Sequence, residues 1–169
     1  MNVLIEEKEI RKKVAELGLQ INADYRDRNP VLIGVLKGAF MFLADLLRET
    51  DIALEVDFLS IRSYNGTESS GVVRITHDLS LNIEDRDVIL VEDIIDTGRT
   101  VKYILDNLRT RKPRSLVVCS LLNKEERRVI EVPLKYVGFT IPGLFVVGYG
   151  LDFDNCYRNL KYIGVLDDK

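Results

Sequence analysis

The sequence predicts an α/β protein built on a mostly parallel sheet. Short, strongly apolar runs alternate along the chain with longer stretches that place apolar residues at helical spacing. The apolar runs are hydrophobic throughout rather than at every second position, which is typical of strands buried on both faces of a parallel sheet. We therefore expect one central sheet with helices covering both of its faces.

The first third of the chain supplies two of the expected helices. Residues 3–28 carry apolar side chains at spacings of three and four with charges between them, which predicts a helix. The apolar run at 31–36 follows Pro30 and predicts a buried strand. A second helix is expected at 38–50, and a strand with polar interruptions at 52–61.

The remaining elements continue the alternation. Residues 63–71, SYNGTESSG, are rich in Ser, Gly and Asn and predict a flexible loop. Strands are expected at 72–76 and 87–92. A helix at 99–110 then leads to a buried strand at 115–122. The last third of the chain is typical of short strands and loops.

Composition and charge restrict the class of protein. The chain has 169 residues, 46% hydrophobic and 30% charged, which predicts a single globular domain over 1–169. No apolar run reaches the roughly 18 residues that cross a membrane, and the charged N-terminus is unlike a signal peptide, so we expect a cytoplasmic protein. The net charge of −3 gives no general attraction to nucleic acid. Cys119 and Cys156 are too few for a disulfide scaffold.

Residues 88–100, VILVEDIIDTGRT, are the most informative for function. Glu92 and Asp93 follow a buried-strand pattern where the strand should end, and Asp96 enters a turn that opens the next helix. Three carboxylates so close together repel one another unless cations or hydrogen-bond donors lie among them. This favours a ligand site over a solvated strand end with a helix cap. Carboxylates can accept hydrogen bonds from sugar hydroxyls, and backbone N–H groups of the turn can donate to a phosphate.

Other nucleotide and metal motifs are absent from the sequence. The chain has no P-loop pattern and no G-x-G-x-x-G after a strand. Its one histidine, His77, excludes a Cys/His zinc cluster and is interpreted as a loop or core residue.

The segment VEDIIDTGRT resembles the diphosphoribosyl-binding motif of the type I phosphoribosyltransferases. Its IIDTG form is similar to that of the 6-oxopurine branch, the hypoxanthine-guanine phosphoribosyltransferases. The resemblance extends over GVLKGAF at 34–40, SYNGT at 63–67, SLLNK at 120–124 and VGFTIP…FVVGYGLD within 137–152. It implies the type I phosphoribosyltransferase fold, in which N-terminal and C-terminal segments form a small hood.

The resemblance also implies a reaction. It is the Mg²⁺-dependent transfer of a 5-phosphoribosyl group from 5-phosphoribosyl-1-diphosphate to N9 of hypoxanthine or guanine, giving IMP or GMP and pyrophosphate. Glu92 and Asp93 would hold the ribose hydroxyls, partly through Mg²⁺. The 5′-phosphate would lie in the turn formed by Asp96, Thr97, Gly98, Arg99 and Thr100. Asp96 would also lie under the purine as the general base at N7.

The purine and metal roles are carried over in the same way. Lys124 would donate to the purine O6, Phe145 would stack on the base, and the backbone of Val146 would read its edge. Asp152 would be a further Mg²⁺ ligand near the purine. The alternative is that Phe145 is a core aromatic and Asp152 a solvated loop carboxylate.

The leaving group and a closing loop complete the implied site. Lys37 and Gly38 resemble the pyrophosphate loop, in which the Leu36–Lys37 peptide can be cis, and Arg158 resembles a pyrophosphate contact. Ser63 and Tyr64 match the mobile loop at 63–71. The alternatives are a surface lysine, a surface salt bridge and an ordinary hairpin tip.

Some positions depart from the family pattern. Gly143 and Leu144 stand where an acidic or polar pair is common, and Phe153 stands where a tyrosine is common. These residues flank the base pocket, so preference among hypoxanthine, guanine and xanthine stays open. Transfer to xanthine or uracil is one alternative function. A non-catalytic regulator that senses phosphoribosyl diphosphate and binds nucleic acid is another. The family resemblance implies a homodimer or homotetramer.

Overall fold

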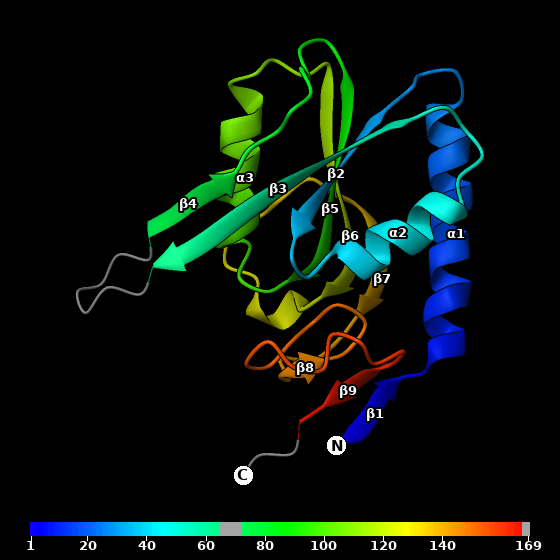
Figure 1. The fold of residues 1–169 in the computed structure, drawn as a ribbon, viewed down its shortest axis with the longest axis vertical. Coiled ribbons are helices and arrows are strands. Elements are labelled where there is room, and N and C mark those ends of the chain that lie inside the picture. Colours follow the sequence, from blue (N-terminus) through cyan, green and yellow to red (C-terminus); the bar gives the residue numbers. More distant parts are fainter. Residues whose placement is uncertain (65–71, 167–169) are drawn as a thin grey trace.

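The computed structural model of the protein describes residues 1–64 and 72–166 (Figure 1). Its main sheet consists of β2 (Val31–Leu36), β3 (Glu55–Tyr64), β4 (Val72–His77), β5 (Asp87–Ile95), β6 (Ser115–Asn123) and β7 (Leu134–Thr140). The strands lie in the order β4-β3-β2-β5-β6-β7. All neighbours are parallel except β3 and β4, which pair antiparallel at one edge. The predicted mostly parallel sheet is confirmed.

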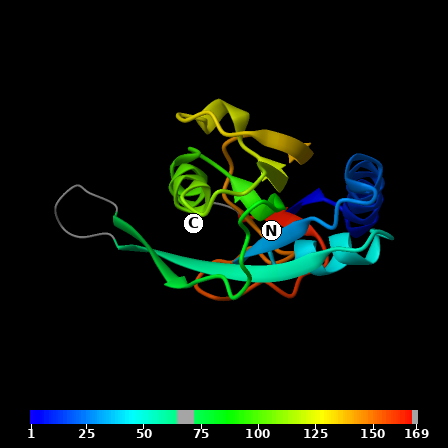
Figure 2. The ribbon, with the colours of Figure 1, turned by 90° about the horizontal axis from the view of Figure 1, so that it is seen from above.

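Helices cover both faces of this sheet. The helices α1 (Glu7–Tyr25) and α2 (Phe40–Arg48) pack on one face, and α3 (Arg99–Arg109) packs on the other (Figure 2). Along β5, Ile89 and Val91 join the apolar cluster of α1 and α2, whereas Val88 and Leu90 join that of α3. All four side chains are 0% exposed. The strand is therefore hydrophobic at every position because both of its faces are buried.

Segments from both ends of the chain form a second, smaller sheet. It consists of β1 (Asn2–Ile5), β8 (Val146–Val147) and β9 (Ile163–Val165), in the antiparallel order β1-β9-β8. Figure 1 shows it below the carboxyl ends of β2, β5 and β6. The expected hood is confirmed, and it lies over the edge where ligands bind in open α/β sheets.

Several element boundaries differ from the sequence prediction, and the strand predicted at 52–61 runs from Glu55 to Tyr64. The helix predicted at 3–28 begins only at Glu7, because residues 2–5 form β1 and pair with β9. The helix start is marked by Glu9, whose carboxylate accepts a hydrogen bond from the Glu6 N–H at 3.0 Å. The strand predicted at 87–92 continues to Ile95, because Ile94 and Ile95 keep their pairing with β6. Glu92 and Asp93 consequently lie within the strand and not after it.

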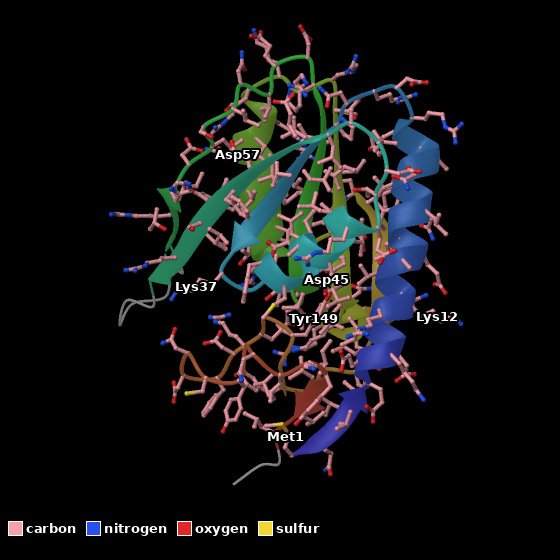
Figure 3. All side chains as sticks on the ribbon, turned by 45° about the vertical axis from the view of Figure 1, so that its right-hand side comes forward. Met1, Lys12, Lys37, Asp45, Asp57 and Tyr149 are labelled. Atoms are coloured by element: carbon pink, nitrogen blue, oxygen red, sulfur yellow. The ribbon has the colours of Figure 1, made fainter. Side chains whose placement is uncertain are left out.

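A buried carboxylate fixes the loop that follows β4. Asp57 on β3 is 5% exposed and accepts hydrogen bonds from the N–H groups of Phe58, Ser80 and Leu81, each at 2.8 Å (Figure 3).

Cys119 is buried in β6 and Cys156 is exposed, and both are free thiols. Within residues 1–64 and 72–166, no helix combines the length and the apolar character needed to cross a bilayer.

Candidate active site

The acidic pair and the turn after it line a pocket at the carboxyl edge of the main sheet. The pocket has a volume of about 250 Å³ and includes Glu92, Asp93, Asp96, Thr97, Gly98 and Thr100, with Leu36 and Gly38 from the end of β2. A second cleft of about 450 Å³ lies between α1, α2 and the loop around Tyr149, whose hydroxyl donates to Asp45 at 2.7 Å (Figure 3). None of the predicted site residues lines this second cleft.

Glu92 and Asp93 are held in a costly electrostatic state. Glu92 is 5% exposed, and burial, followed by the charge of Asp93, raises the pKa of Glu92 well above its ordinary value. Burial raises the pKa of Asp93 to about 6, against the hydrogen bond from the Ile94 N–H at 2.8 Å and the charge of Arg158. A bound cation or sugar hydroxyls would relieve this cost.

The turn from Asp96 to Thr100 is shaped by close backbone packing. Gly98 has a φ of +84° and precedes α3, and a Cβ at this position would lie 2.5 Å from the Ile130 carbonyl oxygen. The Thr97 carbonyl accepts hydrogen bonds from the N–H groups of Val129 and Ile130 at 3.0 and 3.1 Å. The turn is therefore fixed from outside the pocket, at the positive end of the α3 dipole, where an anion is stabilised. Arg99 is exposed.

The predicted pyrophosphate loop packs directly on the acidic pair. The Leu36–Lys37 peptide is cis. A Cβ on Gly38 would lie 1.7 Å from Oδ2 of Asp93, and a Cβ on Gly150 would lie 2.2 Å from the Gly38 carbonyl oxygen. Only glycine at 38 and 150 allows these segments to approach so closely. The Lys37 side chain is exposed (Figure 3).

Arg158 and Asp152 form a compact unit below this loop. The Arg158 guanidinium contacts Oδ1 of Asp152 at 2.6 Å and donates to the Gly150 carbonyl at 2.6 Å. The second Asp152 oxygen accepts a hydrogen bond from the Asn155 N–H at 2.8 Å. The side chains are 22% and 29% exposed, so this is a partly buried contact rather than a surface salt bridge. Both oxygens of Asp152 are engaged by protein groups.

The three predicted metal ligands are not grouped as a protein-only metal site. Across the described ranges, 1–64 and 72–166, no three His, Cys, Asp or Glu side chains lie close enough together to hold a metal ion. Carboxylate oxygens suit Mg²⁺, which commonly takes one or two of them and completes its shell with water and substrate phosphates. Glu92, Asp93 and Asp152 fit that mode of binding, in which the substrate supplies the missing ligands.

Lys124 and Phe145 are the two side chains predicted to contact the purine. Lys124 follows β6, is 7% exposed, and its Nζ lies 3.8 Å from Oδ2 of Asp96. Burial lowers the pKa of Lys124, and the charge of Asp96 opposes that effect. Phe145 is 55% exposed and meets Phe153 edge to face at 5.7 Å. Phe145 is thus not a core aromatic, and its ring is available for stacking. Val146 is buried in β8.

The structure adds two arginines that sequence reasoning missed. Nε of Arg127 lies 3.0 Å from Oδ1 of Asp96. Nε of Arg128 donates to the Asp96 carbonyl at 3.3 Å, and its guanidinium donates to Asn123. Both belong to the run KEERR around a short 3₁₀ turn, η1 (Glu125–Arg127). In the sequence, such a charged run is typical of a solvated loop. The only signal for the two arginines is that they closely follow Lys124.

The closing loop is described only in part. Ser63 and Tyr64 end β3 and pair with Val73 and Val72 of β4. The rest of the predicted loop, 65–71, lies outside the described residues, so its role stays a prediction.

Comparison with known proteins agrees with this geometry. The family model described as the phosphoribosyl transferase domain matches residues 4–154. The hypoxanthine-guanine phosphoribosyltransferase of Bacillus subtilis (strain 168) is 50% identical over 97% of this chain and 92% of its own length. The chain belongs to the hypoxanthine-guanine phosphoribosyltransferase family. The type I phosphoribosyltransferase fold expected from the sequence is thereby confirmed.

Two further similarities define the extent of this family match. A crystal structure of a hypoxanthine-guanine phosphoribosyltransferase from Bacillus anthracis, with HEPES in its active site, superposes with a TM-score of 0.94 at 44% identity and covers 99% of both chains. The Listeria monocytogenes bifunctional protein TilS/HprT is 50% identical over 97% of this chain, which spans only 26% of that relative's length. The phosphoribosyltransferase family thus includes longer proteins that carry this unit as one part.

Proposed function

We propose that the protein is a purine salvage enzyme. It transfers the 5-phosphoribosyl group of 5-phosphoribosyl-1-diphosphate to N9 of hypoxanthine or guanine, giving IMP or GMP and pyrophosphate. The observation that carries this proposal is the convergence of an acidic pair, a phosphate turn and a buried lysine at one edge of the sheet. The family match supports the same activity.

Different parts of the site bind different groups of the substrate. The turn from Thr97 to Thr100 receives the 5′-phosphate at the start of α3. The acidic pair receives the ribose hydroxyls, and the pyrophosphate lies beside Gly38 within reach of Lys37 and Arg158. Mg²⁺, held by Glu92, Asp93 and Asp152 together with substrate oxygens, would neutralise charge on the diphosphate.

Asp96 and the purine exchange a proton during the reaction. The bond from C1′ to the diphosphate oxygen breaks, and both electrons leave with pyrophosphate. The N9 lone pair forms the new bond to C1′, which makes the N7–H of the purine more acidic. The Asp96 carboxylate accepts that proton as a general base. The nucleotide, with an uncharged base, and pyrophosphate are the products.

Lys124 explains the choice of base. An ammonium group donates hydrogen bonds and cannot accept them, so it pairs with the O6 of hypoxanthine or guanine but not with the amino group of adenine. Phe145 supplies an exposed aromatic ring for stacking. Gly143, Leu144 and Phe153 border this pocket, so the rate with xanthine relative to hypoxanthine depends on them.

The decisive experiment incubates the protein with phosphoribosyl diphosphate, Mg²⁺ and one base at a time. The bases are hypoxanthine, guanine, xanthine, adenine and uracil, and each reaction is repeated with a chelator. We expect IMP and GMP, little AMP, and no product without the metal. Failure to form a nucleotide from any 6-oxopurine would overturn the proposal.

The non-catalytic alternative makes a different prediction. A regulator that binds nucleic acid would show affinity that falls steeply with salt. The chain instead has a net charge of −3 and retains Asp96 and Lys124. We expect no binding to RNA or DNA at physiological salt. A homodimer or homotetramer stays a prediction that sedimentation can test.

A further inference from the structure

Asp96 lies between two cations in the purine pocket. Nζ of Lys124 lies 3.8 Å from one oxygen, and Nε of Arg127 lies 3.0 Å from the other. Lys124 is almost fully buried, whereas the Arg127 side chain is 53% exposed. The pocket thus pairs its proposed general base with an arginine for which the reaction described above has no role.

The contact between Arg127 and Asp96 lacks a hydrogen bond, which matters for ligand binding. Oδ1 of Asp96 is buried yet accepts no hydrogen bond from any described residue, although Arg127 stands beside it. The contact is therefore a charge pair without good hydrogen-bond geometry. A donor that approached Oδ1 in line, such as a purine N7–H, would make the hydrogen bond that the arginine does not make.

The backbone that carries Arg127 is fixed, although its head is exposed. The Arg127 N–H donates to the Lys124 carbonyl at 3.1 Å, and the next residues, Val129 and Ile130, donate to Thr97 at 3.0 and 3.1 Å. These hydrogen bonds thus hold the backbone at Arg127 next to the phosphate turn. Its aliphatic stem lies against Gly143, where a Cβ would lie 3.0 Å from Cδ and 3.4 Å from Cγ.

We propose that Arg127 is a positioning residue that acts through Asp96. It pairs with the Asp96 carboxylate while the purine pocket is empty, and it gives up that carboxylate when the N7–H of a 6-oxopurine binds. The guanidinium competes with the base and so sets its apparent affinity. This inference rests on the proposed function, because it assigns Asp96 to N7. Gly143 provides the space in which the Arg127 stem reaches Asp96.

The expected effect is modest because the pair is exposed. An exposed ion pair changes an equilibrium constant by a factor of up to about five. Arg127→Gln should therefore lower the KM for hypoxanthine by about two- to fivefold at saturating phosphoribosyl diphosphate, and kcat/KM should rise in proportion. The KM for phosphoribosyl diphosphate should stay unchanged. A general structural defect would instead change both KM values. Arg127→Lys keeps the charge and should stay closer to the wild type.

Arg109→Gln is the matched control. Arg109 forms an exposed pair at the same 3.0 Å, but with Asp106 on α3 and not with Asp96. The dissociation constant of hypoxanthine, measured by calorimetry without phosphoribosyl diphosphate, is a second readout that needs no turnover. We expect it to fall in Arg127→Gln and not in the control. An unchanged or higher KM and dissociation constant for hypoxanthine in Arg127→Gln would overturn the inference. If the wild type formed no nucleotide, the proposed function would fail, while hypoxanthine binding would still test Arg127.

Gly143→Asp tests the competition from the other side. A carboxylate at this position would offer the Arg127 guanidinium another partner and should lower the KM for hypoxanthine. In the Arg127→Gln background the same change should have little further effect, because the two substitutions act through one contact. An equal effect of Gly143→Asp in both backgrounds would contradict the route through Arg127.

Discussion

At the residue scale, Asp96 combines two tasks that its surroundings separate. Its backbone belongs to the phosphate turn and accepts a hydrogen bond from Arg128. Its carboxylate contacts Lys124 and Arg127, where we propose that the purine binds. A substitution that keeps the shape of the side chain therefore tests the chemistry without removing the turn.

We expect Asp96→Asn to lower kcat by roughly 10²–10⁴, the usual contribution of general acid–base catalysis. The amide is nearly isosteric but cannot accept the N7 proton as a carboxylate does. Steady-state kinetics with hypoxanthine measures the change, and a circular dichroism melt is the control for folding. Turnover near the wild-type rate would remove Asp96 from the role of general base.

Lys124 gives a second prediction at this scale. Lys124→Ala should raise the KM for hypoxanthine about tenfold to a hundredfold, because a hydrogen bond to a charged donor is lost. Discrimination against adenine should weaken at the same time. Competition assays with hypoxanthine and adenine measure both effects. Selectivity equal to that of the wild type would contradict the O6 contact.

At the element scale, the site is the meeting point of strand ends and the turns that follow them. β5 extends to Ile95 and brings the acidic pair into the sheet, while α3 begins directly after Gly98. After Lys124, the N–H groups of Val129 and Ile130 donate to the Thr97 carbonyl and hold the turn from its outer side. The loops from β2 to α2 and from β5 to α3 are short, so the positions of their functional groups follow from the pairing of the strands.

Gly98→Ala tests this arrangement. The φ of +84° disfavours any residue with a Cβ, and that atom would lie 2.5 Å from the Ile130 carbonyl. We expect a loss of about 1–3 kcal/mol in the free energy of unfolding and a higher KM for phosphoribosyl diphosphate. Urea denaturation and initial rates measure the two effects. Arg109→Ala, at an exposed position near the other end of α3, is a comparison variant, and equal effects at both positions would count against a special role for Gly98.

At the scale of the whole molecule, burial of the acidic pair Glu92 and Asp93 lowers the stability of the fold at neutral pH. Burial raises the pKa of Asp93 to about 6 and that of Glu92 well above its ordinary value. In the unfolded chain both groups titrate near their ordinary values of about 4. The native state therefore holds both protons more tightly. For Asp93, this contribution to stability is present below about pH 4 and is lost as pH rises through about 6.

Asp93→Asn should consequently stabilise the metal-free protein at pH 8. The gain in the free energy of unfolding should be up to about 3 kcal/mol and should shrink toward pH 4, because the aspartate is then protonated. Urea denaturation at both pH values, with chelator present, measures it. The exposed Glu131→Gln is the control and should show no such dependence. A variant no more stable than the wild type at pH 8 would show that Asp93 carries no such cost.

The sequence by itself determined the alternation of buried strands and helices, because a strand covered on both faces must be apolar at every position. It also predicted a phosphate site in the turn from Asp96 to Thr100, since three carboxylates and a Thr-Gly turn are neighbours along the chain, and that role stays a prediction. The start of α1 was wrong for a physical reason: residues 2–5 pair with β9, and that partner lies at the other end of the chain.

Only the tertiary structure decided which distant groups meet. Gly38 approaches Asp93, and Gly150 approaches Gly38, through packing that no local pattern encodes. Phe145 is exposed directly before the buried strand β8, and it meets Phe153 edge to face. Arg127 reaches Asp96 because strand pairing sets the ends of β5 and β6 side by side. Local propensity acts over a few residues, whereas these contacts depend on the register and packing of the whole sheet.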